Sequence, residues 1–170
     1  AGTGVISGSV TLEDWLPQAE PNSEESFLAQ AQMPLTVELL DGTGAVVESA
    51  LVGFSNDRKF QFFTAKRGNF VLRVKAAHWL AKTTSVNITD AGVSGLSFSL
   101  MNGDIDGDNS VTVFDYAALS DNFDRVNTDA DAWEVSGTNI AAYMCDLDGD
   151  GAVTVFDYGI LSDNFDQAGE

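Results

Sequence analysis

The sequence predicts a mainly β N-terminal sandwich at residues 1–101, followed by a small all-α module at residues 102–170. Short runs of alternating apolar residues, separated by turn residues about every 8–12 positions, fill the first part and are typical of a sandwich. The second part contains an acidic segment that occurs twice. The charge is also uneven, because residues 102–170 hold 16 acidic residues and one basic residue, against 10 acidic and 7 basic residues before them. Such asymmetry indicates two modules with different roles.

The predicted strands of the first part are bounded by clusters of Gly, Asn, Asp and Pro. The clearest alternation is that of Phe70, Leu72 and Val74, which has the period of two expected for a strand with one buried face. Residues 13–33 are polar and contain two prolines, so we expect a long loop or an inserted flap there. The strands are expected at residues 5–12, 35–40, 45–54, 60–63, 70–75, 83–88 and 95–101.

The composition argues against two classes of partner. The formal net charge is -18, so the chain has no basic surface to neutralise nucleic-acid phosphates or to adsorb on an anionic membrane. No apolar run approaches the length of a membrane span. Cys145 is the only cysteine, which excludes a disulfide within the chain, and we expect it to be a small buried apolar residue.

The repeated segment begins at residue 104 and again at residue 146, and its two copies of 22 residues are identical at 16 positions. Each copy joins an acidic loop to a helical pattern, and a connecting helix is expected within residues 131–144. Three apolar residues of each copy have the i, i+3, i+7 spacing that places them on one helix face, which we expect to face the core. They are Tyr116, Leu119 and Phe123, and then Tyr158, Leu161 and Phe165.

Each copy places aspartates at loop positions 1, 3, 5 and 12, a spacing that can supply the six to eight oxygen ligands that calcium takes. Position 6 is Asn109 or Gly151, residue types that tolerate a positive φ. At position 8, Val111 and Val153 are expected to tie the two loops together by a short strand-like pairing. We therefore expect two Ca²⁺ ions, which act as folding cofactors. The candidate ligands, with position 7 acting through its backbone carbonyl, are Asp104, Asp106, Asp108, Ser110 and Asp115, and Asp146, Asp148, Asp150, Ala152 and Asp157.

With its Gly103-Asp104 start, valine at loop position 8, hydroxyl residue at 9 and aspartate at 12, segment 103–167 resembles a type I dockerin. Dockerins attach cellulosomal and related secreted proteins to cohesin domains. The resemblance implies a dockerin-like EF-hand pair, a cohesin-like partner, and a secreted or cell-surface location in a bacterium. Residues 5–12 and 68–75 more loosely resemble carboxypeptidase regulatory-like, transthyretin-like sandwiches, which implies a structural role for the first part.

The same resemblance implies a partner-binding face, because loop positions 10 and 11 and helix positions 17, 18 and 22 of dockerins contact cohesin. The two copies are identical at four of these five positions, which suggests that either helix can bind the partner. Familiar dockerins often carry Ser or Thr at positions 10 and 11, where this chain carries Val-Phe. The expected contact residues are Val113, Phe114, Ser120, Asp121 and Arg125, and Val155, Phe156, Ser162, Asp163 and Gln167.

We therefore expect a non-enzymatic, calcium-dependent protein–protein docking module joined to a structural sandwich. Two alternatives stay open. In one, the chain is a self-contained structural or adhesion module, stabilised by calcium, whose helices dock on its own sandwich. In the other, Trp15 and Trp79 form a sugar-stacking platform of a carbohydrate-binding module, and a polysaccharide contact through the parent protein is also left open. His78, the sole histidine, is expected to be a hydrogen-bonded structural ring, since no nucleophile motif accompanies it.

Overall fold

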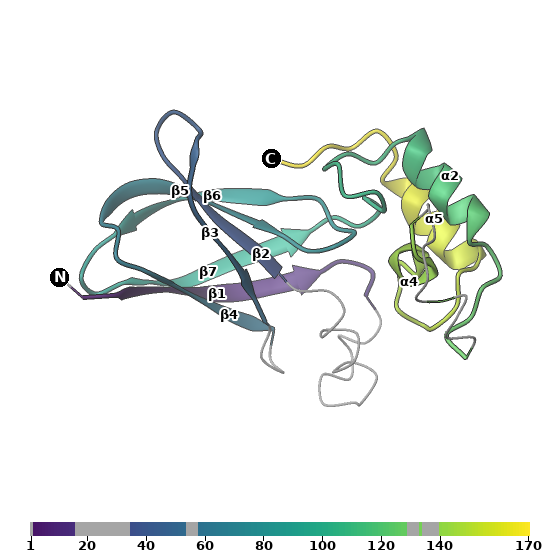
Figure 1. Ribbon diagram of the computed structural model, residues 1–170, viewed down its shortest axis with the longest axis horizontal. Coiled ribbons are helices and arrows are strands. Elements are labelled where there is room, and N and C mark those ends of the chain that lie inside the picture. The colour runs from purple at the N-terminus through teal and green to yellow at the C-terminus, as the bar shows by residue number, and fades with distance from the viewer. Residues whose placement is uncertain (1, 16–34, 54–57, 129–132, 134–139) are drawn as a thin grey trace.

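The computed structural model describes residues 2–15, 35–53, 58–128, 133 and 140–170 (Figure 1). The strands in these ranges are β1 Gly4–Leu12, β2 Leu35–Leu40, β3 Val46–Val52, β4 Lys59–Thr64, β5 Gly68–Lys75, β6 Lys82–Ile88 and β7 Val93–Leu100. Each overlaps a strand expected from the sequence. The expected flap at residues 13–33 lies outside the described residues from position 16 onward.

The strands form two sheets that pack face to face as a sandwich. One sheet has the order β4-β1-β7 and the other the order β3-β2-β5-β6. β1 and β7 run parallel, whereas the other neighbouring strands are antiparallel. β1 therefore lies at the centre of its sheet, between β4 and β7.

Alternation along the strands builds the core between the sheets. In β4, Phe60 and Phe62 are buried while their neighbours Gln61 and Phe63 are exposed. In β5, Leu72 and Val74 are fully buried, as their period of two predicts. Burial of each such side chain contributes about 1.5–3 kcal/mol. The mainly β sandwich expected for the first part is thus confirmed by the structure.

The helical part is built around a second apolar cluster, separate from the core of the sandwich. Its described helices are α2 Val113–Asp121, α4 Ala142–Cys145 and α5 Val155–Asp163. Leu119 of α2 and Leu161 of α5 are buried in this cluster together with Cys145. Most of the connecting helix expected within residues 131–144 lies outside the described residues, and α4 overlaps its last residues.

The expectation that all three residues of each helical pattern face the core is wrong for the aromatic ones. Tyr116, Phe123, Tyr158 and Phe165 are 42–44% exposed. The buried cluster beneath the helices is built from Leu119, Leu161, Trp133 and side chains of the loops and of α4, and none of these four rings belongs to it. Tyr116 and Tyr158 instead meet edge to face, with ring centroids 5.7 Å apart, and so join α2 to α5.

The two parts meet at a buried junction around Asn102. Its side-chain carbonyl lies 2.7 Å from Nδ1 of His78, and its amide nitrogen donates to the carbonyls of Leu147 and Glu13. The backbone carbonyl of Asn102 accepts a hydrogen bond from the side chain of Asn164, which follows α5. One asparagine, placed just before the first repeat, therefore connects the sandwich to the second repeat.

His78 and the two tryptophans nearby are structural. The His78 ring is fully buried and stacks on Trp79, with ring centroids 3.8 Å apart. Burial lowers the pKa of His78 to about 3, so the neutral ring donates from Nδ1 to Asn102. Trp15 packs edge-on against Trp79, and both indoles are buried. The sugar-stacking platform, which the sequence left open as an alternative, is therefore not formed by these two rings, because neither presents a face to solvent.

Among the described helices, none is long and apolar enough to cross a membrane.

We expect Asn102→Ala to lower the free energy of unfolding by about 3 kcal/mol, because Nδ1 of His78 and the carbonyls of Glu13 and Leu147 then lose their partner. The measurement is chemical denaturation followed by tryptophan fluorescence. Asn87→Ala is the control, since Asn87 is exposed on β6 and should change stability by less than about 0.5 kcal/mol. Equal stabilities of the two variants would contradict the role of Asn102.

Candidate metal centre

Two clusters of carboxylates form in the helical part, one in each repeat. We refer to residues 104–115 as loop 1 and to residues 146–157 as loop 2. In each loop, one oxygen from each of four aspartates lies within 4.8 Å of the others. The clusters comprise Asp104, Asp106, Asp108 and Asp115 in loop 1, and Asp146, Asp148, Asp150 and Asp157 in loop 2.

Hydrogen bonds within each loop turn the chain around its cluster. In loop 1, backbone N–H groups of Asp108 and Ser110 donate to the side chains of the aspartates two residues earlier, and Asn109 N donates to Asp104 Oδ2. Loop 2 repeats these bonds at the equivalent positions. Asn109 has a φ of 69° and Gly151 a φ of 89°, which confirms that position 6 requires a left-handed backbone.

The aspartate at position 12 connects each loop to its helix. Asp115 Oδ1 accepts the backbone N–H of Asp106 at 3.0 Å, and Oδ2 accepts that of Thr112 at 2.7 Å. Thr112 is the N-cap of α2, and its hydroxyl accepts a hydrogen bond from Phe114 N. Asp157 and Thr154 form the same capping box at α5. The Thr-x-x-Asp spacing of this motif is visible in the sequence, but its capping role is not among our expectations.

Crowding and partial burial of the carboxylates make both clusters electrostatically costly, since two of the four are buried in loop 1 and three of the four in loop 2. Desolvation, together with neighbouring aspartates, raises the pKa of Asp146 to about 9 and that of Asp157 to about 7. In loop 1, desolvation raises the pKa of Asp106 to about 7 and also raises that of Asp104. Asp104 is fully buried, and its Oδ1 has no hydrogen-bond partner. A buried, unpartnered carboxylate oxygen fits a cation ligand.

The expected pairing of Val111 with Val153 is wrong, because each valine pairs with the chain that leaves the other repeat's helix. Val111 exchanges backbone hydrogen bonds with Asp166 and Gln167 beyond α5. Val153 does the same with residues 124 and 125, beyond α2. The short segment after each helix runs beside the opposite loop. Its backbone occupies the N–H and C=O groups of each valine, so the two valines cannot pair with each other.

The residues at loop position 7 also pair with the chain beyond the opposite helix. Ser110 forms an antiparallel β-bridge with Ala168, and Ala152 forms one with Val126.

Every residue of the expected partner-binding face is exposed. The valine and phenylalanine at the start of each helix are 58–70% exposed, although such side chains are usually buried. The polar members of the face are exposed as well. We call this set the docking face: Val113, Phe114, Ser120, Asp121 and Arg125, and Val155, Phe156, Ser162, Asp163 and Gln167.

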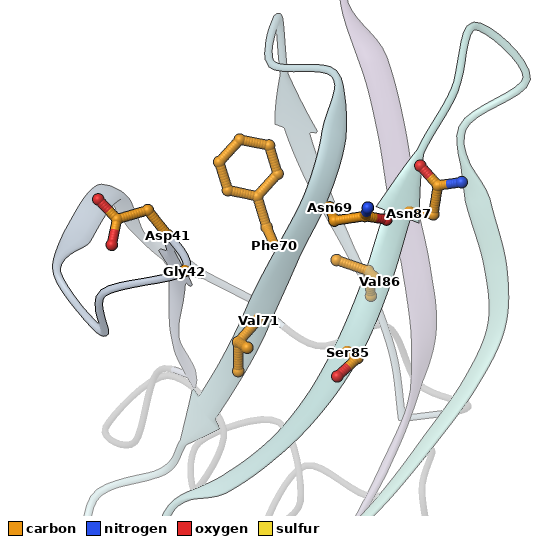
Figure 2. Close-up of a pocket in the computed structure, with 8 residues that line it drawn as sticks. All are labelled: Asp41, Gly42, Asn69, Phe70, Val71, Ser85, Val86 and Asn87. Atoms are coloured by element: carbon orange, nitrogen blue, oxygen red, sulfur yellow. The ribbon is translucent and has the colours of Figure 1, made fainter.

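The sandwich has a hollow of about 460 Å³, bordered by β5, β6 and the turn after β2 (Figure 2). Asp41 is the only carboxylate among the residues that line it. That carboxylate accepts hydrogen bonds from Thr43 and Ala45 within its own turn, which also lower its pKa. A glycoside hydrolase site needs two carboxylates across the bond that is cleaved, and this hollow offers one, already engaged.

No family model matches the chain, and no curated protein matches it. Among solved structures, it is similar to chains of two mutants of a type II Cohesin-X-Dockerin complex from Acetivibrio cellulolyticus, one mutated at the N-terminal interface and the other at the C-terminal interface. Each match has 21% identity and a TM-score of 0.61 and covers 97% of both chains. A DUF3823 family protein from Parabacteroides merdae has a TM-score of only 0.36. At these identities the likeness concerns the fold alone.

We expect the double variant Asp115→Ala, Asp157→Ala to lose most of its helical circular dichroism, because it removes a loop crosslink and a helix cap from both repeats. The matched control is Asp121→Ala, Asp163→Ala, which removes the same charge from exposed positions of α2 and α5. The control should keep its helical signal. A helical spectrum preserved in the first variant would contradict the structural role of position 12.

Proposed function

We propose that the chain is a non-enzymatic module for calcium-dependent protein–protein docking, with one Ca²⁺ in each loop and a cohesin-like domain as its partner. One repeated combination carries the proposal: a cluster of four carboxylates is followed directly by a helix whose first two residues are an exposed valine and phenylalanine. The position-12 aspartate belongs to the cluster and also caps the helix. Metal binding and presentation of the docking face thus depend on the same residue.

Calcium is the cation that best suits this donor set. The clusters offer only oxygen, which hard cations prefer, and they gather four carboxylates, whereas Mg²⁺ usually keeps several waters and few protein carboxylates. The four aspartates of each loop would hold the ion, with the carbonyls of Ser110 and Ala152 as further ligands. A bound divalent cation would offset the repulsion that raises the carboxyl pKa values. The ordered loops would then fix the start of α2 and α5.

The exposed apolar residues support a protein partner. Val113 and Phe114 extend from α2 into solvent, and Val155 and Phe156 do so from α5. Aromatic side chains surrounded by polar residues are frequent anchors of protein interfaces. Tyr116 of α2 and Tyr158 of α5 are partly exposed as well.

The choice of a cohesin-like partner over a dockerin-like one follows from the carboxylate loops. The similar structures are complexes that contain both kinds of module, and the alignment covers this chain's sandwich and its helical part together. Because this chain itself carries the duplicated loops, we assign it the dockerin side. A secreted or cell-surface location agrees with this function, since calcium sites of extracellular modules work at millimolar calcium.

The near-identical repeats support binding through either helix. The four large apolar residues of the docking face have closely matched exposure, 58% and 69% in the first copy against 61% and 70% in the second. Ser120 and Asp121 have Ser162 and Asp163 as exact counterparts in the second copy. A half-turn of the module would therefore present the same face to a partner.

The structural alternative has weaker support. It requires the helices to dock on their own sandwich, but the exposed docking face contradicts such packing. The contacts between the two parts run instead through Asn102, Leu80, the loops and the C-terminal Glu170, whose N–H donates to the carbonyl of Ala81. These contacts suit a sandwich that acts as a rigid neighbour of the docking module.

We expect removal of calcium with a chelator to abolish the helical circular dichroism of the second part, because the carboxylates of each loop then repel one another. Readdition of calcium should restore the signal, and titration calorimetry should give two ions per chain. Magnesium at the same concentration is the control and should restore little. A helical signal that does not depend on calcium would contradict the proposal.

We expect Phe114→Ala to leave partner affinity within about twofold of wild type, since Phe156 offers an equivalent anchor. Phe114→Ala combined with Phe156→Ala should weaken binding at least about 100-fold, in the range of interface hot spots. The measurement is surface plasmon resonance against a panel of purified cohesin and dockerin domains in calcium. Leu51→Ala, which truncates an exposed apolar residue of β3, is the control and should have no effect.

Two outcomes would contradict these expectations. A complete loss of binding from Phe114→Ala alone would exclude binding through either helix. Binding to dockerin domains, unaffected by the double substitution, would instead assign the interaction to the sandwich.

A further inference from the structure

A basic side chain of the sandwich contacts one of the candidate calcium ligands. Lys75, the last residue of β5, places its Nζ 2.8 Å from Oδ2 of Asp104, the first residue of loop 1. Asp104 is fully buried and the Lys75 side chain is 22% exposed. In loop 2, the equivalent Asp146 has its two oxygens bound by the backbone N–H groups of Gly149 and Gly151.

The ammonium group of Lys75 is held in place by the sandwich. It lies within hydrogen-bond distance of the backbone carbonyls of Ala76, Ala77 and Trp79, at 3.2, 3.2 and 3.0 Å. These carbonyls belong to the segment that follows β5. The positive charge therefore stays next to loop 1 whether or not a cation occupies the carboxylate cluster.

Asp104 does not depend on Lys75 for its position. Its Oδ2 also accepts the backbone N–H of Asn109, and its own N–H donates to the carbonyl of His78. Asn109 in turn accepts a hydrogen bond from Ala81 N through its side chain. Loop 1 is thus fixed to the sandwich by several neutral contacts, and what Lys75 adds beyond them is mainly its charge.

We propose that Lys75 lowers the calcium affinity of loop 1 and so sets the calcium concentration at which this site fills. The inference rests on the proposed calcium function. An ion held by Asp104 would be close to the ammonium, and at a separation of about 5 Å in water-like surroundings the repulsion between a divalent and a monovalent cation changes a binding constant about tenfold. The same charge also forms an ion pair with the buried Asp104 carboxylate, so Lys75 competes with a cation for that ligand.

The test compares wild type with Lys75→Met, which removes the charge and keeps the length of the side chain, and with Lys75→Arg, which keeps the charge. The control is Lys82→Met, because Lys82 is a lysine of the neighbouring strand β6 that pairs with Glu170 rather than with Asp104. Calcium is titrated in chelator-buffered solutions into the whole chain. The backbone amide resonances of Asn109 and Gly151 report loop 1 and loop 2 separately.

Lys75→Met should tighten calcium binding at loop 1 about tenfold and change loop 2 by less than about twofold. Lys75→Arg and Lys82→Met should both stay within about twofold of wild type at both loops. Unchanged or weaker binding at loop 1 in Lys75→Met would overturn the inference. Equal tightening in Lys82→Met would overturn it as well, because the effect would then be one of overall charge.

Two further outcomes also decide the question. If neither resonance of the wild type responds to calcium, both the proposed function and this inference fail. If the wild type binds calcium and Lys75→Met has no effect on that binding, only the inference is overturned. If Lys75→Met does not fold, Lys75→Gln, which retains hydrogen-bond donors without the charge, carries the same expectation. Failure of both variants to fold would overturn the claim that neutral contacts hold loop 1.

Discussion

The second half of the structure depends on one electrostatic constraint. It gathers eight aspartates into two clusters and buries several of them. Burial and mutual repulsion oppose the charged state of these carboxyl groups, which is why the pKa values of several are raised. Other groups of the chain partly compensate this repulsion. Backbone N–H groups donate to the carboxylates, and Lys75 supplies one positive charge to loop 1. These groups leave Asp104 Oδ1 without a partner, and the proposed calcium ions complete the balance.

The same residues that satisfy the carboxylates also build the rest of the module. Asp115 and Asp157 cap the helices, so the order of each loop is transmitted to α2 and α5. The chain beyond each helix then pairs with the opposite loop through Val111 or Val153. The two repeats therefore form a closed arrangement in which neither loop is complete without the other repeat.

Attachment to the sandwich uses the loop side of this module and leaves the outer sides of the helices free. Asn102 connects the His78 ring to Leu147, and Lys75 reaches Asp104 from the end of β5. The docking face consequently remains exposed although the two parts of the chain are in contact. An attachment that leaves these residues exposed is compatible with the docking function proposed above.

The sequence by itself determined the strands of the sandwich and the composition of the two carboxylate clusters, because each depends on local spacing or on exact repetition. Whether the Val-Phe pairs are exposed or pack on the sandwich was left open by the sequence, and the tertiary structure leaves them exposed. Only the tertiary structure decided that Tyr116 and Tyr158 meet at the surface, that Val111 pairs beyond α5, and that Trp15 and Trp79 are buried. It also decided that Lys75 and Asn102 act on loop residues. These contacts join segments that periodicity cannot relate, since a repeat of two or 3.6 residues gives the face of an element but not the neighbour that covers it.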